Sequence, residues 1–297
     1  MKNLSVENVY TRASAKELTK KYFWKLLGML AIVLGITYAI AFGGTALLAL
    51  GGNEPVFAIG YIVLMVVMVL VASGLSMGLY AAMIDLCRGN EDVTVGRVFS
   101  RMGKCLKAFG LSLWVGLKTI LWALPVYIPV IVMALLLMDN PSLQANKSAQ
   151  IIVAFLPFVA LILIFALVVP AAMRYMLSTY ILAVKPDTGV FECVRKSKAM
   201  MKGHKWQAFK LAVPIILAMY GILMVASVVI SSAAAFVATN EALITAMGIL
   251  MMIVLLGIVV YFSIRLYLCY AIFYLNRVKE MTPAEEPAEA PAESPAE

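Results

Sequence analysis

Three positively charged residues lie inside stretches of the sequence that are otherwise hydrophobic. Arg174 lies in the run 151–184 and Arg265 in the run 243–275, at matching places, and Lys118 is a similar distance into an earlier run. A charged side chain at the centre of a bilayer costs at least ~2.5–3.5 kcal/mol, so such residues normally face a bundle interior or a wet cavity and have a partner. The chemistry that these residues predict is the binding of an anion.

Tyrosines follow both arginines closely in the sequence. The predicted lipid or anion site comprises Arg174, Arg265, Lys118, Tyr175 and Tyr267, with Tyr180 and Tyr270 beside it. Asp85, at the cytosolic end of the run 56–86, is the only candidate carboxylate, and it cannot pair with both arginines. The missing counter-charge would be a lipid phosphate, which arginine binds through two parallel hydrogen bonds. The alternative is that both arginines only snorkel to the cytosolic interface.

The segment 190–206 is the second candidate for contact with anions. As a helix, it carries its basic residues on one stripe: Arg195, Lys198, Lys202 and Lys205, with His204 beside them. The other side is apolar: Val190, Cys193, Val194, Ser197, Met200 and Met201. This pattern predicts a helix in the membrane interface, with lysines against anionic headgroups. The alternative is an anchor that only follows the positive-inside rule. Segments 1–25 and 92–107 are predicted to be basic helices of the same kind. In the segment 92–107, Arg97, Arg101 and Lys104 lie on one side.

Residues suited to catalysis or metal binding are few and scattered. The four cysteines show no CxxC spacing and are interpreted as small apolar side chains; the alternative is a zinc site from Cys87, Cys105, Cys193 and His204. The sequence contains no HExxH, GxSxG, P-loop or DxD-type cluster. Because catalysis needs positioned acids, bases, nucleophiles or metal ligands, we expect no enzyme activity, no cofactor and no metal site.

Composition places these residues in a membrane protein. The chain is 63% hydrophobic and 13% charged, whereas a soluble domain has about 25% charged residues. The net charge of +8 follows from basic segments beside hydrophobic runs, so we expect no nucleic-acid partner.

The hydrophobic runs predict an all-α fold with six transmembrane helices. Five of the runs cover about 26–50, 56–86, 151–184, 211–237 and 243–275. The other run, third in the sequence, follows residue 107 and ends near residue 138. Pro125, Pro129 and Pro170 predict kinks. A basic leader, a span, a tight turn and an overlong span recur about every 90 residues. The membrane domain 1–279 is therefore predicted to contain three hairpin units, about 1–90, 91–186 and 187–279. Residues 280–297, rich in Pro, Ala and Glu, predict a disordered tail.

The distribution of charge predicts the orientation. The leaders hold nearly all of the 24 Lys and Arg, while the opposite turns contain Lys147 as their only basic residue. By the positive-inside rule both termini are cytosolic. The polar leader before the first span predicts that no signal peptide is cleaved.

The segments Tyr180–Thr188 and Arg195–Trp206 resemble the signature of the bacterial domain of unknown function 975 family. Further similarity lies at Arg88-Gly89 with Val98-Phe99, at Arg12–Lys16 and at Tyr270–Tyr274, so the resemblance spans most of residues 8–276. The chain departs from the family where Ala171 follows Pro170, a position at which the family has glycine. The family is distantly similar to the membrane domain of some glycerophosphodiester phosphodiesterases, whose catalytic domain this chain lacks. The resemblance implies a fold and a location in the bacterial inner membrane, but no activity.

Two functions remain open from the sequence. The first is a non-catalytic scaffold or envelope-associated module whose partners are anionic lipids. The second is a transporter or flippase-like carrier of an anionic lipid or small molecule. Coupled transport usually needs a carboxylate deep in the membrane, and the runs contain none.

Overall fold

The computed structural model describes residues 4–50, 54–139, 147–236 and 241–281, and this part of the chain is helical without strands. Its elements are α1 (Leu4–Leu50), α2 (Glu54–Cys87), the 3-10 helix η1 (Val95–Lys104), α3 (Cys105–Asp139), α5 (Lys147–Tyr175), α6 (Ser178–Val184), α7 (Val190–Met200), α8 (Lys205–Phe236) and α9 (Glu241–Met281). Six helices are long and apolar enough to cross a membrane. The predicted all-α, multi-pass membrane protein is confirmed.

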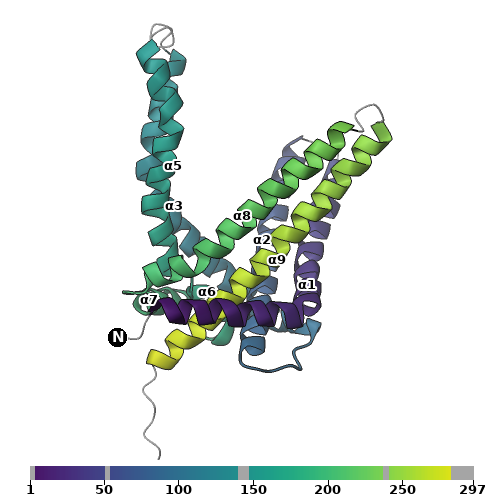
Figure 1. Ribbon diagram of the computed structural model, residues 1–297, viewed down its shortest axis with the longest axis vertical. Coiled ribbons are helices and arrows are strands. Elements are labelled where there is room, and N and C mark those ends of the chain that lie inside the picture. Colours follow the sequence, from purple (N-terminus) through teal and green to yellow (C-terminus); the bar gives the residue numbers. More distant parts are fainter. Residues whose placement is uncertain (1–3, 51–53, 140–146, 237–240, 282–297) are drawn as a thin grey trace, which may run out of the picture.

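Consecutive long helices lie side by side: α1 with α2, α3 with α5, and α8 with α9 (Figure 1). The three pairs separate from one another towards one end and converge at the other. We call the convergent end the base; it contains the first part of α1 together with η1, α6 and α7. That the pairs are a threefold repeat stays a prediction from the sequence.

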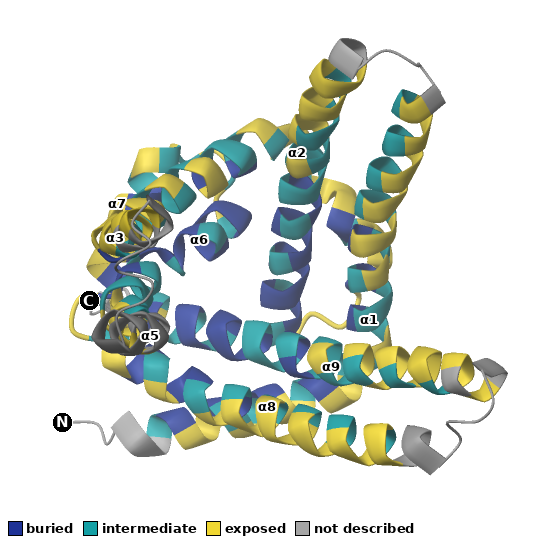
Figure 2. Cartoon of the chain, turned by 90° about the horizontal axis from the view of Figure 1, so that it is seen from above, coloured by how far each residue is buried: buried dark blue, intermediate teal, exposed yellow. Residues whose placement is uncertain are grey.

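Buried side chains gather at the base, whereas the far ends of the pairs are largely exposed (Figure 2). Met83 from α2, Leu182 from α6 and Phe273 from α9 are each at most 2% exposed. Towards the far ends, apolar side chains such as Phe42 and Ile62 are 71% and 65% exposed. Exposed apolar side chains on membrane-length helices meet lipid tails, so only the base resembles the core of a soluble protein.

The first helix changes direction at Tyr22, whose backbone is not helical (φ −114°, ψ 17°). The residues before Tyr22 lie across the base and those after it run along α2 (Figure 1). Ala15 and Thr19 of the first part are fully buried, and the Thr19 hydroxyl donates to the Ala15 carbonyl at 2.7 Å. The predicted division into a leader and a span is therefore present within one element.

The second leader differs from the prediction. Residues 92–107 are predicted as one basic α-helix, but the chain forms the 3-10 helix η1, and α3 begins at Cys105. Glycines at 96 and 103 weaken an α-helix here. Tertiary contacts then fix the segment, because Arg97 donates to Oδ2 of Asp85 from Nε at 3.0 Å and from Nη2 at 2.8 Å.

The predicted span 151–184 is two helices. α5 continues through Pro170 and ends at Tyr175, and α6 starts at Ser178. The Ser178 hydroxyl donates to the Tyr175 carbonyl at 2.5 Å and so satisfies one of the carbonyls that the break frees. α6 is buried in the base, which explains why its sequence is as apolar as a membrane span. α3 likewise continues through Pro125 and Pro129.

The last helix is longer than a membrane crossing requires. α9 has 41 residues, which correspond to about 60 Å, whereas the hydrocarbon core is about 30 Å thick. Its last turns therefore extend into the base and include Glu280, where the sequence predicts the start of the tail. Residues 282–297 lie outside the described residues.

Candidate functional site

Arg174, at the end of α5, lies among residues of three other helices. Its guanidinium carbon is 5.1 Å from the ring centroid of Trp122 in α3, and its backbone carbonyl accepts a 2.9 Å hydrogen bond from the Ser197 hydroxyl in α7. The charges of Arg174 and Lys198 both act on Lys205 at the start of α8. Nε of Arg174 is buried without a hydrogen-bond partner among the described residues. The side chain therefore has neighbours on three other helices, while no carboxylate of the described residues pairs with its charge.

Lys118 and Tyr175, two residues of the predicted site, lie close together. Nζ of Lys118 lies 5.6 Å from the ring centroid of Tyr175 and 5.1 Å from that of Trp114. Both distances fall within the range of a cation–π interaction, which stabilises an ammonium group without a carboxylate. Tyr175 is also the residue after Arg174, so three of the five predicted site residues share one region.

Arg265 and Tyr267 have other neighbours. Arg265 lies in α9, which packs against α1. The backbone carbonyl of Tyr267 accepts a 3.1 Å hydrogen bond from the hydroxyl of Tyr180.

The Tyr267 ring belongs to a buried aromatic cluster rather than to the surroundings of Arg174. The ring centroid of Tyr80 lies 5.0 Å from that of Tyr180 and 5.6 Å from that of Tyr267. The ring centroids of Tyr180 and Tyr274 are 6.2 Å apart. Tyr270 is also buried. Among the described residues, no contact joins Arg174 to Arg265 directly, so a joint site for the two stays a prediction.

In the basic segment 190–206, Arg195, Lys198 and Lys202 are exposed, whereas His204 and Lys205 are half-buried. The apolar side packs on the protein: Cys193, Val194, Ser197, Met200 and Met201 are buried in the base. The prediction that this side lies in the membrane interface is therefore wrong for these residues. The segment is also not one helix, because α7 ends at Met200 and a turn with Gly203 at φ +83° precedes α8.

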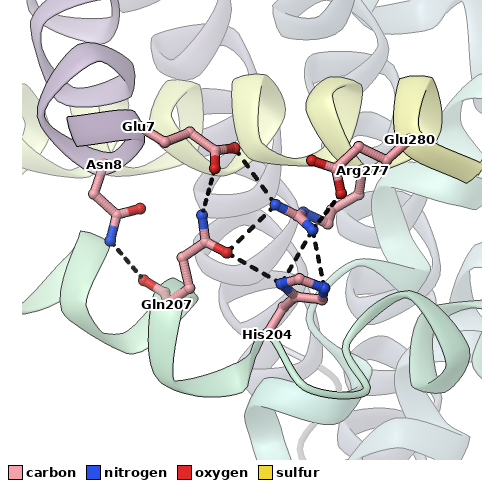
Figure 3. A network of polar contacts seen from close by, with 6 residues as sticks. All are labelled: Glu7, Asn8, His204, Gln207, Arg277 and Glu280. Carbon is pink, nitrogen blue, oxygen red and sulfur yellow. Dashed lines mark hydrogen bonds and ion pairs between the residues drawn. The ribbon is translucent and has the colours of Figure 1, made fainter. Parts of the chain in front are cut away.

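A polar network that includes His204 joins the two ends of the chain at the base (Figure 3). Arg277 of α9 is 3% exposed, and its Nη1 lies 2.6 Å from Oε2 of Glu280 and 3.0 Å from either ring nitrogen of His204. Its Nη2 lies 3.4 Å from Oε1 of Glu7 and 3.3 Å from Oε1 of Gln207. Arg277 is the centre of this network.

The amide of Gln207 links Glu7 to the imidazole of His204. Nε2 of Gln207 donates to Oε2 of Glu7 at 3.1 Å, and its Oε1 lies 3.2 Å from Nδ1 of His204. Asn8 adds a 3.3 Å hydrogen bond to the Gln207 backbone carbonyl. Sequence reasoning places His204 on the basic stripe and misses the other members, because their spacing in the sequence carries no local signal.

One comparison with known proteins finds a family. The family described as "Protein of unknown function (DUF975)" matches residues 6–276. The chain belongs to this family. The match runs from the first part of α1 into α9 and so includes all six membrane-length helices.

No curated protein and no solved structure matches this DUF975 chain. The more distant similarity to the membrane domain of glycerophosphodiester phosphodiesterases is not confirmed.

The cysteines of this DUF975 protein do not meet as metal ligands. Among the described residues, no group of three or more His, Cys, Asp or Glu side chains could hold a metal ion. Burial raises the pKa of the Cys193 thiol, which disfavours the thiolate that zinc requires.

Two pockets lie between helices near the candidate residues. One of about 300 Å³ separates α5 from α8 and is lined by Lys205 together with Phe165, Ala166, Val169, Pro170, Met173, Trp206 and Phe209. The second, of about 350 Å³, lies between α2, α3 and α6, and its lining includes the hydroxyl groups of Ser73, Ser76, Tyr80, Ser112 and Thr179. A third pocket, between α8 and α9, is entirely apolar.

Proposed function

We propose that the protein is a non-catalytic module of the bacterial inner membrane that contacts anionic lipids. In this proposal the base faces the cytosol, both termini are cytosolic, and the basic side chains of the base lie against headgroups of the inner leaflet. The sequence supports the orientation, because its basic residues concentrate in the segments that form the base.

The observation that carries the proposal is a contrast within α7 and the turn after it. Lys196 pairs with Glu192 at 2.6 Å, one helical turn away. The exposed Arg195, Lys198 and Lys202 form no ion pair with a carboxylate in the described ranges. Each basic side chain near an anionic membrane surface contributes about 1 kcal/mol, so these three suit phospholipid headgroups.

The carboxylates and the pockets support a non-catalytic role. Asp85 pairs with Arg97, Glu91 with Lys21, Asp187 with Lys104, and both Glu7 and Glu280 with Arg277. None of the three pockets described above is lined by a carboxylate, a histidine or a cysteine. General acid–base chemistry needs such a group within hydrogen-bond reach of a bound substrate.

Lipid selectivity tests the proposal. The full-length protein, reconstituted in vesicles, is titrated with spin-labelled phosphatidylglycerol and phosphatidylcholine, and the immobilised fraction of each label is measured. We expect the parent to prefer phosphatidylglycerol, and Arg195→Gln with Lys202→Gln to reduce that preference severalfold, since each charge contributes about 1 kcal/mol.

The matched control for lipid selectivity is Lys196→Gln. This substitution removes a lysine of the same helix that is already paired with Glu192, so the preference should remain. Equal association of both lipids with the parent would contradict the proposal.

A carrier is the second candidate, and the pocket between α2, α3 and α6 is the observation that favours it. Hydroxyl groups such as those of Ser76 and Thr179 lie there between membrane-length helices, where they can hydrogen-bond the polar part of a passing molecule. The test measures how fast proteoliposomes translocate a fluorescent anionic lipid between leaflets, or a small anion across the bilayer. A rate equal to that of protein-free vesicles would exclude this function.

A further inference from the structure

We propose that the pocket between α5 and α8 binds one anionic phospholipid, whose phosphate is held by Arg174, Lys198 and Lys205 and whose acyl chain enters the pocket. This inference rests on the proposed function and adds to it a single defined site. It differs from the surface contact of α7, because it depends on residues of α5 and α8 and on a cavity.

The cationic side of the site comes from three elements that converge at the base. Arg174 ends α5, Lys198 lies on α7, and Lys205 starts α8. Ser197, the neighbour of Lys198, donates a 2.9 Å hydrogen bond to the Arg174 carbonyl, and Lys205 lines the same pocket as Met173, the neighbour of Arg174. The three cations therefore belong to one region of the base. Like charges repel unless a counter-charge is present, and none of the three pairs with a carboxylate of the described residues.

Arg174 is prepared for a phosphate. The Trp122 ring centroid lies 5.1 Å from its guanidinium carbon, and its backbone carbonyl accepts the hydrogen bond of the Ser197 hydroxyl. Its Nε is buried, so an oxyanion would meet the two terminal Nη groups, which form no ion pair with a carboxylate of the described residues. Two parallel hydrogen bonds from one guanidinium suit an oxyanion.

The apolar side of the site adjoins these cations. Met173, the neighbour of Arg174, and Lys205 itself both line the pocket of about 300 Å³. Its other lining residues are aromatic or aliphatic, and Trp206 stacks on Phe209 with centroids 5.2 Å apart. The volume is at the lower end of small-molecule sites, about 300–1,000 Å³, and so suits part of one acyl chain.

Together these features select an amphiphile. A free phosphate ester would satisfy the cations and leave an apolar pocket unfilled, whereas a neutral lipid would fill the pocket and leave three cations without a counter-charge. A phospholipid with a net negative headgroup satisfies both. Trp206, 63% exposed with Lys210 Nζ 5.4 Å from its ring, lies at the rim, as tryptophan does at membrane interfaces.

Native mass spectrometry of the full-length protein, titrated with phosphatidylglycerol after delipidation, tests the site. We expect one phosphatidylglycerol to bind more tightly than the rest. Arg174→Gln and Lys205→Gln should each weaken it about tenfold, which is the effect of one charge-assisted contact. Arg174→Lys should weaken it too, because an ammonium group cannot form the doubly hydrogen-bonded pair. Ala166→Trp, which fills the pocket and keeps every charge, should also weaken it.

Matched controls distinguish this site from a general effect of charge and from a phosphate site without a chain. Arg265→Gln removes another half-buried arginine of a membrane-length helix, whose Nε likewise lacks a partner among the described residues, and should leave the tight lipid bound. Glycerol 3-phosphate should not displace it, whereas lysophosphatidylglycerol, with one chain, should. Displacement by glycerol 3-phosphate at the same concentration would show that the chain contributes nothing and would overturn the proposal, as would parent-like binding in Arg174→Gln or in Ala166→Trp.

Two further readouts keep the site testable on its own. If the variants fold poorly, a photoactivatable phosphatidylglycerol with its label in the acyl chain is cross-linked to the parent protein. Cross-links to the lining residues of α5 and α8 support the site, whereas cross-links that occur only elsewhere overturn it.

The second readout separates this site from the surface contact. If the Arg195→Gln, Lys202→Gln protein loses its general lipid preference and keeps the tight lipid, both proposals stand. If the parent shows no general preference and still keeps the tight lipid, the surface proposal alone fails.

Discussion

Glu7 and Arg277 are 270 positions apart in the sequence, yet Oε1 of Glu7 lies 3.4 Å from Nη2 of Arg277. This ion pair joins the first part of α1 to the last turns of α9 and closes the base around the start of α8 (Figure 3). Arg277 is almost completely buried, so its charge depends on Glu7 and Glu280 for compensation.

The first prediction concerns this pair. Arg277→Gln leaves two carboxylates without their cation, and removing one partner of a buried pair costs about 3–5 kcal/mol. We expect a clearly lower thermal midpoint for the variant in detergent, measured by circular dichroism. Lys21→Gln, which breaks the exposed pair with Glu91, is the control and should leave the midpoint almost unchanged, because water screens an exposed ion pair. Equal effects of the two substitutions would contradict the structural role of Arg277.

The second prediction concerns the contact between α2 and η1. A Cβ at Gly78 would lie 1.9 Å from the backbone carbonyl oxygen of Val98, so Gly78→Ala must move η1 away from α2. Such overpacking costs about 1–3 kcal/mol. Gly28→Ala is the matched control, because no atom lies within 4 Å of its Cβ and alanine favours the helix by roughly 0.5–1 kcal/mol. Thermal unfolding should therefore shift in opposite directions, and a shared direction would contradict the close approach.

The third prediction concerns pH. Nζ of Lys104 donates a hydrogen bond to Oδ1 of Asp187 at 3.0 Å. This hydrogen bond lowers the pKa of the Asp187 carboxyl group, and the charge of Lys104 acts in the same direction. Because the folded-state pKa is lowered, the pair stabilises the fold above the ordinary pKa of aspartate, and its contribution disappears as pH falls through the lowered value. A titration followed by carboxyl ¹³C chemical shift should show a midpoint below the ordinary value.

Substitution of the neighbouring lysines provides the check on that titration. Lys104→Gln should return the Asp187 midpoint towards the ordinary value, and Lys107→Gln should change it less, since the effect of Lys107 is smaller. A parent midpoint at the ordinary aspartate value would rule out the pair in solution.

The fourth prediction concerns orientation. Cysteines placed at Asn53, Asn140 and Asn240, all outside the described residues, should react with an impermeant thiol reagent applied from outside, in a background without the native cysteines. A cysteine at Lys202, exposed at the base, should react only after the membrane is opened. Reaction of the Lys202 position in intact cells would invert the proposed topology.

Much of the fold was predictable because membrane insertion depends on local composition. A hydrophobic run of sufficient length predicts a spanning helix whatever its partners, and the six runs correspond to the six membrane-length helices. The same property produced an error at residues 178–184, because a short helix buried in the base is as apolar as a span.

The candidate site was predictable only in part. A charge inside an apolar run identifies Arg174 and Lys118 as residues that need a partner, and the structure supplies Trp122 and Tyr175. That Lys205 lines the pocket next to Arg174 depends on which helix ends converge at the base.

The sequence by itself determined that this chain crosses a membrane with six helices and concentrates its basic residues beside them. The tertiary structure decided where α5 ends, that the apolar side of α7 packs on protein, and that Glu7 reaches Arg277. The physical reason is that the free energy of transfer into a membrane adds up residue by residue along a segment. The neutralisation of a buried charge depends instead on side chains that only the folded chain brings within a few ångströms.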